Sequence, residues 1–309
     1  MCIYLLIVNK YNLQCLIMEL SISFRTFGVA KHLTMEKKTA RCIRSVEIQN
    51  LWSRRSHVKW QLKPDVNVLS GVNGMGKSTI LNRLIDRLDS SRGDVPDGNM
   101  LHGVRIVLEP TEANHVKYDV IRSFDRPLVI GQAVEKLTGT NVITELDWQL
   151  YRLQRRYLDY QVNIGNSMIA MLTSGAPDAR ERAEELAAVK VRFQDTVDEL
   201  FAETGKNIDR TSNEIAFMQL GEKLLPYQLS SGEKQMLVIL LTALTEDGQP
   251  YVLFMDEPEI SLHIDWQQKL ISIIRKLNPN VQIILTTHSP AVIMDGWLDT
   301  VTDVADIIV

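Results

Sequence analysis

A nine-residue segment from Gly71 to Thr79, GVNGMGKST, combines three glycines with a lysine and two hydroxyl side chains. Glycines let the backbone curl so that its N–H groups point at a phosphate chain. The lysine supplies a cation for the outer phosphates, and the serine hydroxyl after it can ligate Mg²⁺. The segment therefore predicts a site for a nucleoside triphosphate with Mg²⁺. The residues expected to bind it are Gly71, Asn73, Gly74, Gly76, Lys77, Ser78 and Thr79, with Ser78 also a metal ligand.

A pair of acids, Asp256 and Glu257, follows the apolar run from Tyr251 to Met255. Such a run suits a buried parallel strand, whose carboxyl end lies at the sheet edge where ligands of doubly wound folds bind. There Asp256 would hold Mg²⁺ and Glu257 would act as the general base toward a water molecule. Two adjacent acids can also begin a solvated helix. Pro258 directly after the pair favours a turn, and with it the catalytic interpretation.

A second apolar run, from Val281 to Thr287, ends at His288. A single histidine is most often structural. At the end of a core strand that follows the acid pair, however, the imidazole is well placed to contact the terminal phosphate of a nucleotide. We therefore predict that His288 acts as a phosphate sensor beside the catalytic Glu257.

Patterns of period two and of helical spacing predict the elements that must position these residues. The phosphate loop should follow a strand at 66–71 and open a helix whose apolar residues recur from Ile80 to Leu88. Strands and helices that alternate in this way predict an α/β fold. Further strands are predicted at 45–50, 58–62, 104–109 and 116–123.

Two amphipathic helices are predicted between the phosphate loop and the strand that bears the acid pair. Each carries apolar residues at spacings of four and three, and the short segment 174–177 joins them, so they should form an antiparallel hairpin. The hairpin can pack on the sheet as a subdomain. Alternatively, it can project as an arm of roughly 24 residues that reaches about 36 Å. The apolar residues are Leu146, Leu150, Leu153, Tyr157, Tyr160 and Ile164, then Leu186, Val189, Phe193, Val197 and Leu200.

These patterns divide the chain into four parts: an N-terminal extension at 1–34, a first lobe at 35–139, the hairpin at 140–205 and a second lobe at 206–309. The extension is apolar but interrupted by polar residues, and its apolar run is far below the roughly 20 residues that span a bilayer. We expect it to lie upstream of the true start at Met35. A membrane-touching tail and an extra structured segment are the alternatives.

The composition is that of a globular protein, with 45% hydrophobic and 23% charged residues among 309. The formal net charge is -4, so no overall positive field would recruit nucleic acid. The three cysteines, at positions 2, 15 and 42, do not have the spacing of metal ligands. This usage favours a reducing, cytoplasmic location.

The order of these motifs resembles that of the ATP-binding cassette ATPases. GVNGMGKST is similar to their Walker A motif, LSSGEKQ to the signature, MDEPE to Walker B and TTHSP to the switch histidine. Within that superfamily the chain looks more like the RecF-like, chromosome-maintenance and phage-defence AAA ATPase heads than like a transporter cassette. It has His263 where transporters usually have aspartate, a turn NLWSRRSH similar to one in repair heads, and a hairpin where those relatives place a coiled coil. The resemblance covers about Arg44 to the C-terminus.

The resemblance implies a P-loop NTPase fold with an ABC-type ATPase core, in which a mixed sheet is flanked by helices. It also implies an ATP-dependent homodimer in which two heads enclose two ATP molecules. The signature of one copy would contact the ATP of the other. Arg55, or its neighbour Arg54, would touch the nucleotide, with a solvated basic turn as the alternative. A glutamine ligand of Mg²⁺ is also expected, for which Gln132 is the best match and Asp125 the alternative. The signature residues are Ser230, Ser231, where many relatives have glycine, Gly232 and Glu233.

The function that this resemblance implies is an ATPase that dimerises around ATP and gates a partner in DNA repair or anti-phage defence. The chain carries no nuclease signature, so a nuclease or toxin would be a separate effector protein. The ATP-binding subunit of a membrane transporter is the alternative. A nucleotide-binding module with little turnover is a third hypothesis, which the intact Glu257 and His288 oppose. Contact between the hairpin and nucleic acid stays open, because acidic residues are interleaved with its basic ones.

Overall fold

The computed structural model describes residues 37–54, 56–122 and 142–309. The expectations for the extension at 1–34, for Arg55, for Asp125 and for Gln132 therefore lie outside the described residues. The chain divides into two units, and the second, Lys38–Val309, carries every element described below. Within the described ranges, no helix is both long and apolar enough to cross a membrane.

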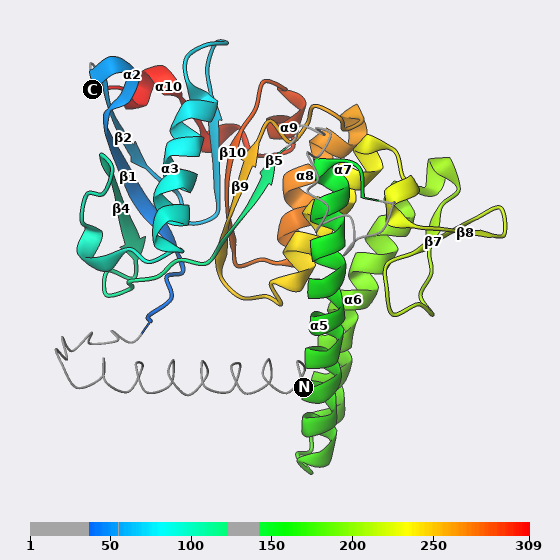
Figure 1. Ribbon diagram of the computed structural model, residues 1–309. Coiled ribbons are helices and arrows are strands. Elements are labelled where there is room, and N and C mark those ends of the chain that lie inside the picture. Colours follow the sequence, from blue (N-terminus) through cyan, green and yellow to red (C-terminus); the bar gives the residue numbers. More distant parts are fainter. Residues whose placement is uncertain (1–36, 55, 123–141) are drawn as a thin grey trace, which may run out of the picture. The chain divides into compact units, whose positions relative to one another are not determined.

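A parallel sheet of five strands forms the core of this second unit (Figure 1). Its strand order is β11-β3-β10-β9-β5, and each neighbouring pair is parallel. The strands β9 and β10 are buried along nearly their whole length, as expected for strands covered on both faces. The bounds are β3 Val66–Ser70, β5 Tyr118–Arg122, β9 Tyr251–Asp256, β10 Val281–Thr286 and β11 Val301–Asp303.

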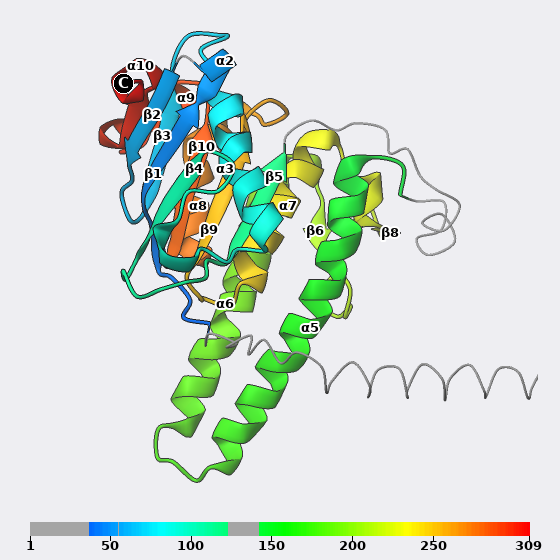
Figure 2. The same ribbon diagram turned by 60° about the vertical axis from the view of Figure 1, so that its left-hand side comes forward.

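Different elements cover the two faces of the parallel sheet (Figures 1 and 2). On one face, α3 and an antiparallel sheet of order β2-β1-β4 share a core with Phe254 and Ile284. On the other face, α7 and α8 share a core with Leu253 and Ile283. The predicted α/β class is confirmed, with the mixed strand directions divided between two sheets. The bounds are β1 Cys42–Asn50, β2 Ser56–Gln61, β4 Val104–Glu109, α3 Lys77–Ser91, α7 Ser231–Thr245 and α8 Ile264–Leu277.

The hairpin consists of α5 (Glu145–Thr173) and α6 (Ala179–Leu200). Thr144 caps the start of α5 in a capping box, which satisfies backbone N–H groups of the first turn. Close to the sheet the hairpin is packed, and Tyr157 is only 1% exposed within the core that also contains α7. Toward the tip the helices leave the sheet, and Ile169 is 62% exposed. The hairpin is thus a packed subdomain at its base and a projecting arm at its far end (Figure 2).

Ion pairs join α5 to both ends of α7. Near the start of α7, Lys234 lies 2.8 Å from Oδ1 of Asp147. At its C-terminal end, the buried Glu246 pairs with Arg156, which also contacts Asp119 of β5 at 3.1 Å. Burial raises the pKa of Asp119 to about 6, and the positive charge of Arg156 offsets only part of this rise. Because removing one partner of a buried ion pair leaves an uncompensated charge, these contacts fix α5 on α7.

Several short elements were not predicted. An antiparallel meander precedes the signature segment, and β11 extends the parallel sheet beside β3. The helix after β11 places the side chain of Val304 only 3.5 Å from where a Cβ on Gly71 would stand. These short elements are β6 Asn207–Ile208, β7 Phe217–Gln219, β8 Glu222–Leu224, α2 Leu51–Arg54, α9 Ala291–Met294 and α10 Val304–Ile307.

Candidate functional site

The loop between β3 and α3 has a backbone that glycine favours. Gly74 and Gly76 both have a φ of +85°, in the left-handed region. A Cβ on Gly76 would stand 2.0 Å from Cζ2 of Trp52, so there is no room for a side chain. The helix α3 begins at Lys77, and the first N–H groups of a helix have no partner within it. Loop and helix together therefore form a cradle suited to phosphate oxygens.

Gly76→Ala should weaken nucleotide binding by at least about tenfold. The new methyl group would have to displace the ring of Trp52. The alanine backbone would also have to adopt a left-handed conformation, which costs an L-residue roughly 1–2 kcal/mol. A cost of about 1.4 kcal/mol corresponds to a factor of ten in affinity. Equilibrium binding of a fluorescent ATP analogue measures the effect. Gly165→Ala is the matched control, because Gly165 lies in α5 with open space around it. Equal affinities of Gly76→Ala and wild type would contradict the cradle.

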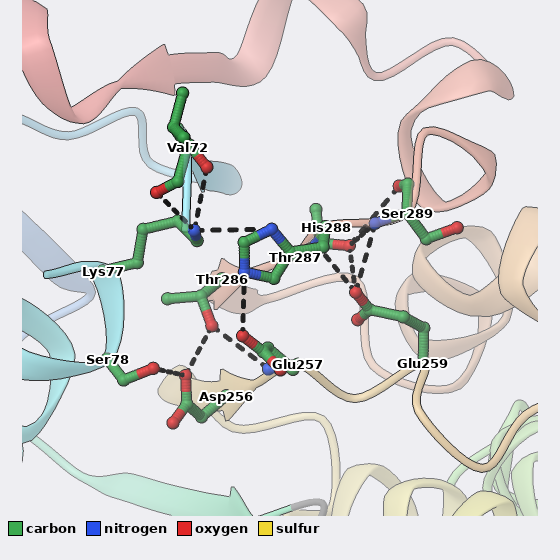
Figure 3. Close-up of polar contacts among 11 residues, drawn as sticks. Val72, Lys77, Ser78, Asp256, Glu257, Glu259, Thr286, Thr287, His288 and Ser289 are labelled. Carbon is green, nitrogen blue, oxygen red and sulfur yellow. Dashed lines mark hydrogen bonds and ion pairs between the residues drawn. The ribbon is translucent and has the colours of Figure 1, made fainter. Parts of the chain in front are cut away.

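Lys77 and Ser78 direct their side chains to the ends of the neighbouring strands (Figure 3). The ammonium group of Lys77 donates to the carbonyl oxygen of Gly71 at 2.9 Å and lies 3.5 Å from Nδ1 of His288. The hydroxyl group of Ser78 donates to Oδ1 of Asp256 at 2.9 Å. Lys77 is only 4% exposed. A buried ammonium group is costly without an opposite charge, and the phosphates of a nucleotide would supply that charge.

Adjacent strands bring the acid pair and the histidine together. In the pairing of β9 with β10, Asp256 stands opposite Thr286. The hydroxyl group of Thr286 donates to Oδ1 of Asp256 at 2.6 Å and accepts from the N–H of Glu257 at 3.1 Å. Glu257 has a φ of +48°, a strained value for a residue with a side chain, and such strain is typical of functional sites. From this turn, Oε1 of Glu257 lies 3.0 Å from Nε2 of His288.

The His288 ring has one polar contact on each nitrogen. Nδ1 faces the ammonium group of Lys77 at 3.5 Å. On the other side of the ring, an Nε2–H group can donate to the carboxylate of Glu257 at 3.0 Å. His288 thereby offers a hydrogen-bond donor that orients Glu257.

These side chains surround one pocket with a volume of about 430 Å³. In the part of the chain that the structure describes, no group of three or more histidine, cysteine or acidic side chains could hold a metal ion. A divalent ion here would need oxygens from the nucleotide as well as from Ser78 and Asp256, which is how Mg²⁺ usually binds beside phosphates. The residues fit Mg²⁺ with ATP on that basis. The pocket is lined by Trp52, Asn73, Gly74, Gly76, Lys77, Ser78, Thr79, Glu257 and His288.

Trp52 is a lining residue that the sequence analysis missed. It belongs to α2, has a φ of +46° and is 39% exposed. Its ring lies over Gly76, where an exposed aromatic surface can stack on a nucleotide base. The signal for it in the sequence is an aromatic residue inside the turn NLWSRRSH, next to the two arginines.

The signature segment forms the start of α7. Ser230 is its N-cap, and its N–H donates to the carboxylate of Glu233 at 2.9 Å in a capping box. Burial acts to raise the pKa of Glu233, but hydrogen bonds from Lys206 and Ser230 outweigh it and the pKa is lowered. The buried carboxylate of Glu233 therefore orders this segment within its own chain. A Cβ on Gly232 would stand 2.4 Å from the carbonyl oxygen of Ser261, so this position requires glycine.

The site residues fall into two groups in the described chain. Most of the phosphate loop, Glu257 and His288 line one pocket, and Asp256 accepts a hydrogen bond from Ser78 of that lining. None of Ser230, Ser231 and Gly232 lines it. Lys234, next along α7, is engaged by Asp147. The structure therefore joins the predicted catalytic residues to each other and leaves the signature as a separate surface of the same chain.

A family match and two curated relatives agree on the kind of domain. The family described as "AAA domain, putative AbiEii toxin, Type IV TA system" matches residues 141–295, half of the chain. The chain is 33% identical over 98 residues to the Retron Vc95 probable ATPase of Vibrio cholerae serotype O1 biovar El Tor, covering 28% of this chain and 19% of that protein. It is 42% identical over 77 residues to the Retron Ec83 probable ATPase of Escherichia coli, covering 21% of this chain and 14% of that protein.

The matched segments span less than a fifth of the length of these two curated relatives. Among solved structures, the chain is similar to an SMC head bound to the C-winged helix domain of ScpA. That similarity has 13% sequence identity and a TM-score of 0.48, and it covers 82% of this chain and 92% of that one.

Proposed function

This chain belongs to the AAA-domain family that matches its residues 141–295, and from that premise we propose that it binds and hydrolyses ATP as a homodimer. The closed dimer would gate a separate effector, a nuclease or a toxin, in the cytoplasm. The two retron ATPases among the relatives favour phage defence over DNA repair, and they favour both over the alternative of a transporter subunit.

One observation carries the proposal of ATP hydrolysis: Lys77, Ser78, Asp256, Glu257 and His288 meet in one place although they come from three separate segments (Figure 3). The combination provides a cation for phosphates, two oxygen ligands for a divalent ion, and a carboxylate with a defined donor partner. A module that only binds nucleotide would not need a carboxylate with a defined donor partner.

Each side chain has a role in the proposed reaction. Lys77 would hold the outer phosphates, while Ser78 and Asp256 would hold Mg²⁺, which neutralises charge on those phosphates when bound. Glu257 would accept a proton from water as the water oxygen bonds to the terminal phosphorus and the bond to the ADP oxygen breaks. His288 would keep the Glu257 carboxylate directed at that water. The products are ADP and inorganic phosphate.

The separation of the signature from the pocket supports the proposal that the site is shared between two copies. The start of α7 carries the positive end of a helix dipole, and Ser230, its N-cap residue, is exposed there, a combination suited to an anion. The signature of a chain does not line its own pocket, which agrees with the contact that the resemblance to ATP-binding cassette ATPases implies, between this segment and the ATP held by a second copy.

Direct contact with nucleic acid is not part of this proposal. Much of the basic charge on the hairpin is engaged by neighbouring side chains, which reduces the number of cations that could contact the phosphates of a nucleic acid. The engaged residues are Arg156 with Asp119 and Glu246, Arg180 with Glu184, Arg182 with Asp178, and Lys190 with Gln161.

Ser230→Arg should abolish ATP-dependent dimerisation and lower turnover at least about a hundredfold, while ATP binding by the monomer stays intact. A long cation at the N-cap would obstruct the shared surface, and loss of the cap itself costs only about 0.5–2 kcal/mol. Analytical ultracentrifugation with ATP, alongside a phosphate-release assay, measures both quantities. Ser167→Arg is the matched control, because Ser167 is an exposed residue of α5.

Mixing two inactive variants gives the sharpest test of a shared site. A Lys77→Ala chain retains its signature, and a Ser230→Arg chain retains its phosphate loop. Mixed dimers should contain one complete pocket and regain part of the wild-type rate, although each variant alone is inactive. Hydrolysis by isolated Ser230→Arg monomers at the wild-type rate would show that each chain holds a complete site.

A further inference from the structure

A second glutamate in the loop after β9, Glu259, is buried although it lies only two residues beyond Glu257. It is 6% exposed, and its Oε1 accepts three hydrogen bonds from the turn after β10 (Figure 3). The hydroxyl group of Thr287 donates at 2.6 Å, the N–H of His288 at 2.9 Å and the N–H of Ser289 at 3.3 Å. One carboxylate oxygen therefore holds the backbone of the turn that presents His288.

Gln267 of α8 joins the same two segments at another point. Its Nε2 donates to the carbonyl oxygens of Glu259 at 3.2 Å and Leu262 at 2.9 Å, and its Oε1 accepts from the hydroxyl group of Ser289 at 2.6 Å. The loop after β9 and the turn after β10 are thus connected through two side chains. A displacement of one segment would be passed to the other.

The same loop also packs against the signature. The carbonyl oxygen of Ser261 lies only 2.4 Å from where a Cβ on Gly232 would stand. The loop therefore contacts the start of α7 on one side and, through Glu259, the turn of His288 on the other. It is the physical connection between the signature surface and the catalytic pocket of one chain.

We propose that Glu259 is the positioning residue that aims His288 at Glu257, and that it does so by accepting hydrogen bonds from the backbone of the turn after β10. This inference rests on the proposed ATPase function and adds a residue to it. Glu259 is not a second general base, because it does not line the pocket and its Oε1 is already engaged by donors from the turn. Its other carboxylate oxygen is buried without a hydrogen-bond partner among the described residues, so all of the side-chain hydrogen bonds described for Glu259 go to the turn after β10.

Two substitutions separate this role from a catalytic one. In Glu259→Gln the amide oxygen can accept the same three hydrogen bonds, so we expect the folded variant to retain kcat within about threefold. Its NH2 group would stand where Oε2 has no partner, so the variant should be less stable than wild type. In Glu259→Ala two N–H groups and a hydroxyl lose their acceptor, and kcat should fall by roughly 30-fold or more. The affinity for a fluorescent ATP analogue should change by less than about threefold, because no residue of the phosphate loop contacts Glu259 in the described contacts.

A double-mutant cycle with His288→Ala tests whether Glu259 acts through the histidine. If it does, Glu259→Ala combined with His288→Ala should be no slower than His288→Ala alone. Multiplied losses, or a Glu259→Gln variant as inactive as Glu257→Gln, would overturn the proposal. Should Glu259→Ala not fold, Gln267→Leu removes the other connection and should show a smaller loss of kcat that His288→Ala likewise masks.

An NMR measurement keeps this inference separable from the ATPase proposal. In histidine-labelled protein, the Nε2–H signal of His288, assigned by its absence in His288→Ala, should be present in wild type and Glu259→Gln and absent in Glu259→Ala. Full turnover by wild type together with an unchanged signal in Glu259→Ala would defeat the positioning role alone. A wild-type chain without turnover would defeat the ATPase proposal, and the signal would still report on Glu259.

Discussion

Glu257→Gln should lower the rate of ATP hydrolysis by about 10²- to 10⁴-fold, the range typical of removing a general base. Gln has the same shape but cannot accept a proton from water. Its carbonyl oxygen can still accept the hydrogen bond from Nε2 of His288, which lies 3.0 Å from the carboxylate in wild type. ATP binding should therefore be retained, and a phosphate-release assay beside a binding titration measures the two effects separately.

The same variant should accumulate as a dimer when ATP is added, because closure no longer leads to hydrolysis and reopening. Size-exclusion chromatography with and without ATP shows this directly. Glu222→Gln is the matched control, since Glu222 is an exposed residue of β8. A Glu257→Gln chain that stays monomeric and hydrolyses ATP at the wild-type rate would exclude both the base and the dimer.

Lys77→Ala should reduce the affinity for ATP by about a hundredfold or more. A hydrogen bond to a charged group is worth roughly 1.5–3 kcal/mol, and an ammonium group between two phosphates would make at least two. The loss should be larger for ATP than for ADP if Lys77 reaches the terminal phosphate. Isothermal titration calorimetry with both nucleotides measures the difference.

The control for this loss is Lys59→Ala, which removes the same charge from an exposed position on β2. It should leave both affinities unchanged. Undiminished binding by Lys77→Ala, or an equal loss in both variants, would show that the pocket beside α3 is not where the phosphates bind.

The elements next to the site could be predicted from the sequence because each has a strong local pattern. The apolar runs that end at Asp256 and His288 are the strands β9 and β10, and the helix after the phosphate loop is α3, as predicted. Most of the hairpin seam is also buried as its heptad-like spacing indicates, with Leu150 fully buried, whereas Leu186 and Val189 are only partly buried. Which residues of these elements lie next to each other could not be predicted in the same way, because it is the pairing of β9 with β10 that places Asp256 opposite Thr286.

Other features have no local pattern. Residues 301–303 form β11, but three residues are too few for a periodic signal. Glu259 stands in an acid-rich loop and reads as a surface residue, because its burial comes from the turn after a distant strand. Glu233 likewise turns inward because Lys206 and Thr204 approach it from outside α7. Such tertiary contacts decide which of several acids is buried, and a single sequence does not contain them.

The ion pairs that join α5 to both ends of α7 make the hairpin a lever on the signature helix. From Arg156 to the end of α5 at Thr173, the helix extends about 26 Å at 1.5 Å per residue. If α7 tilts by about 10° as two copies close on ATP, the hairpin tip sweeps through roughly 4–5 Å, an amplitude common in allosteric transitions. A protein bound to the hairpin tip would therefore respond to which nucleotide occupies the pocket, because a small tilt of α7 becomes a larger displacement at the tip.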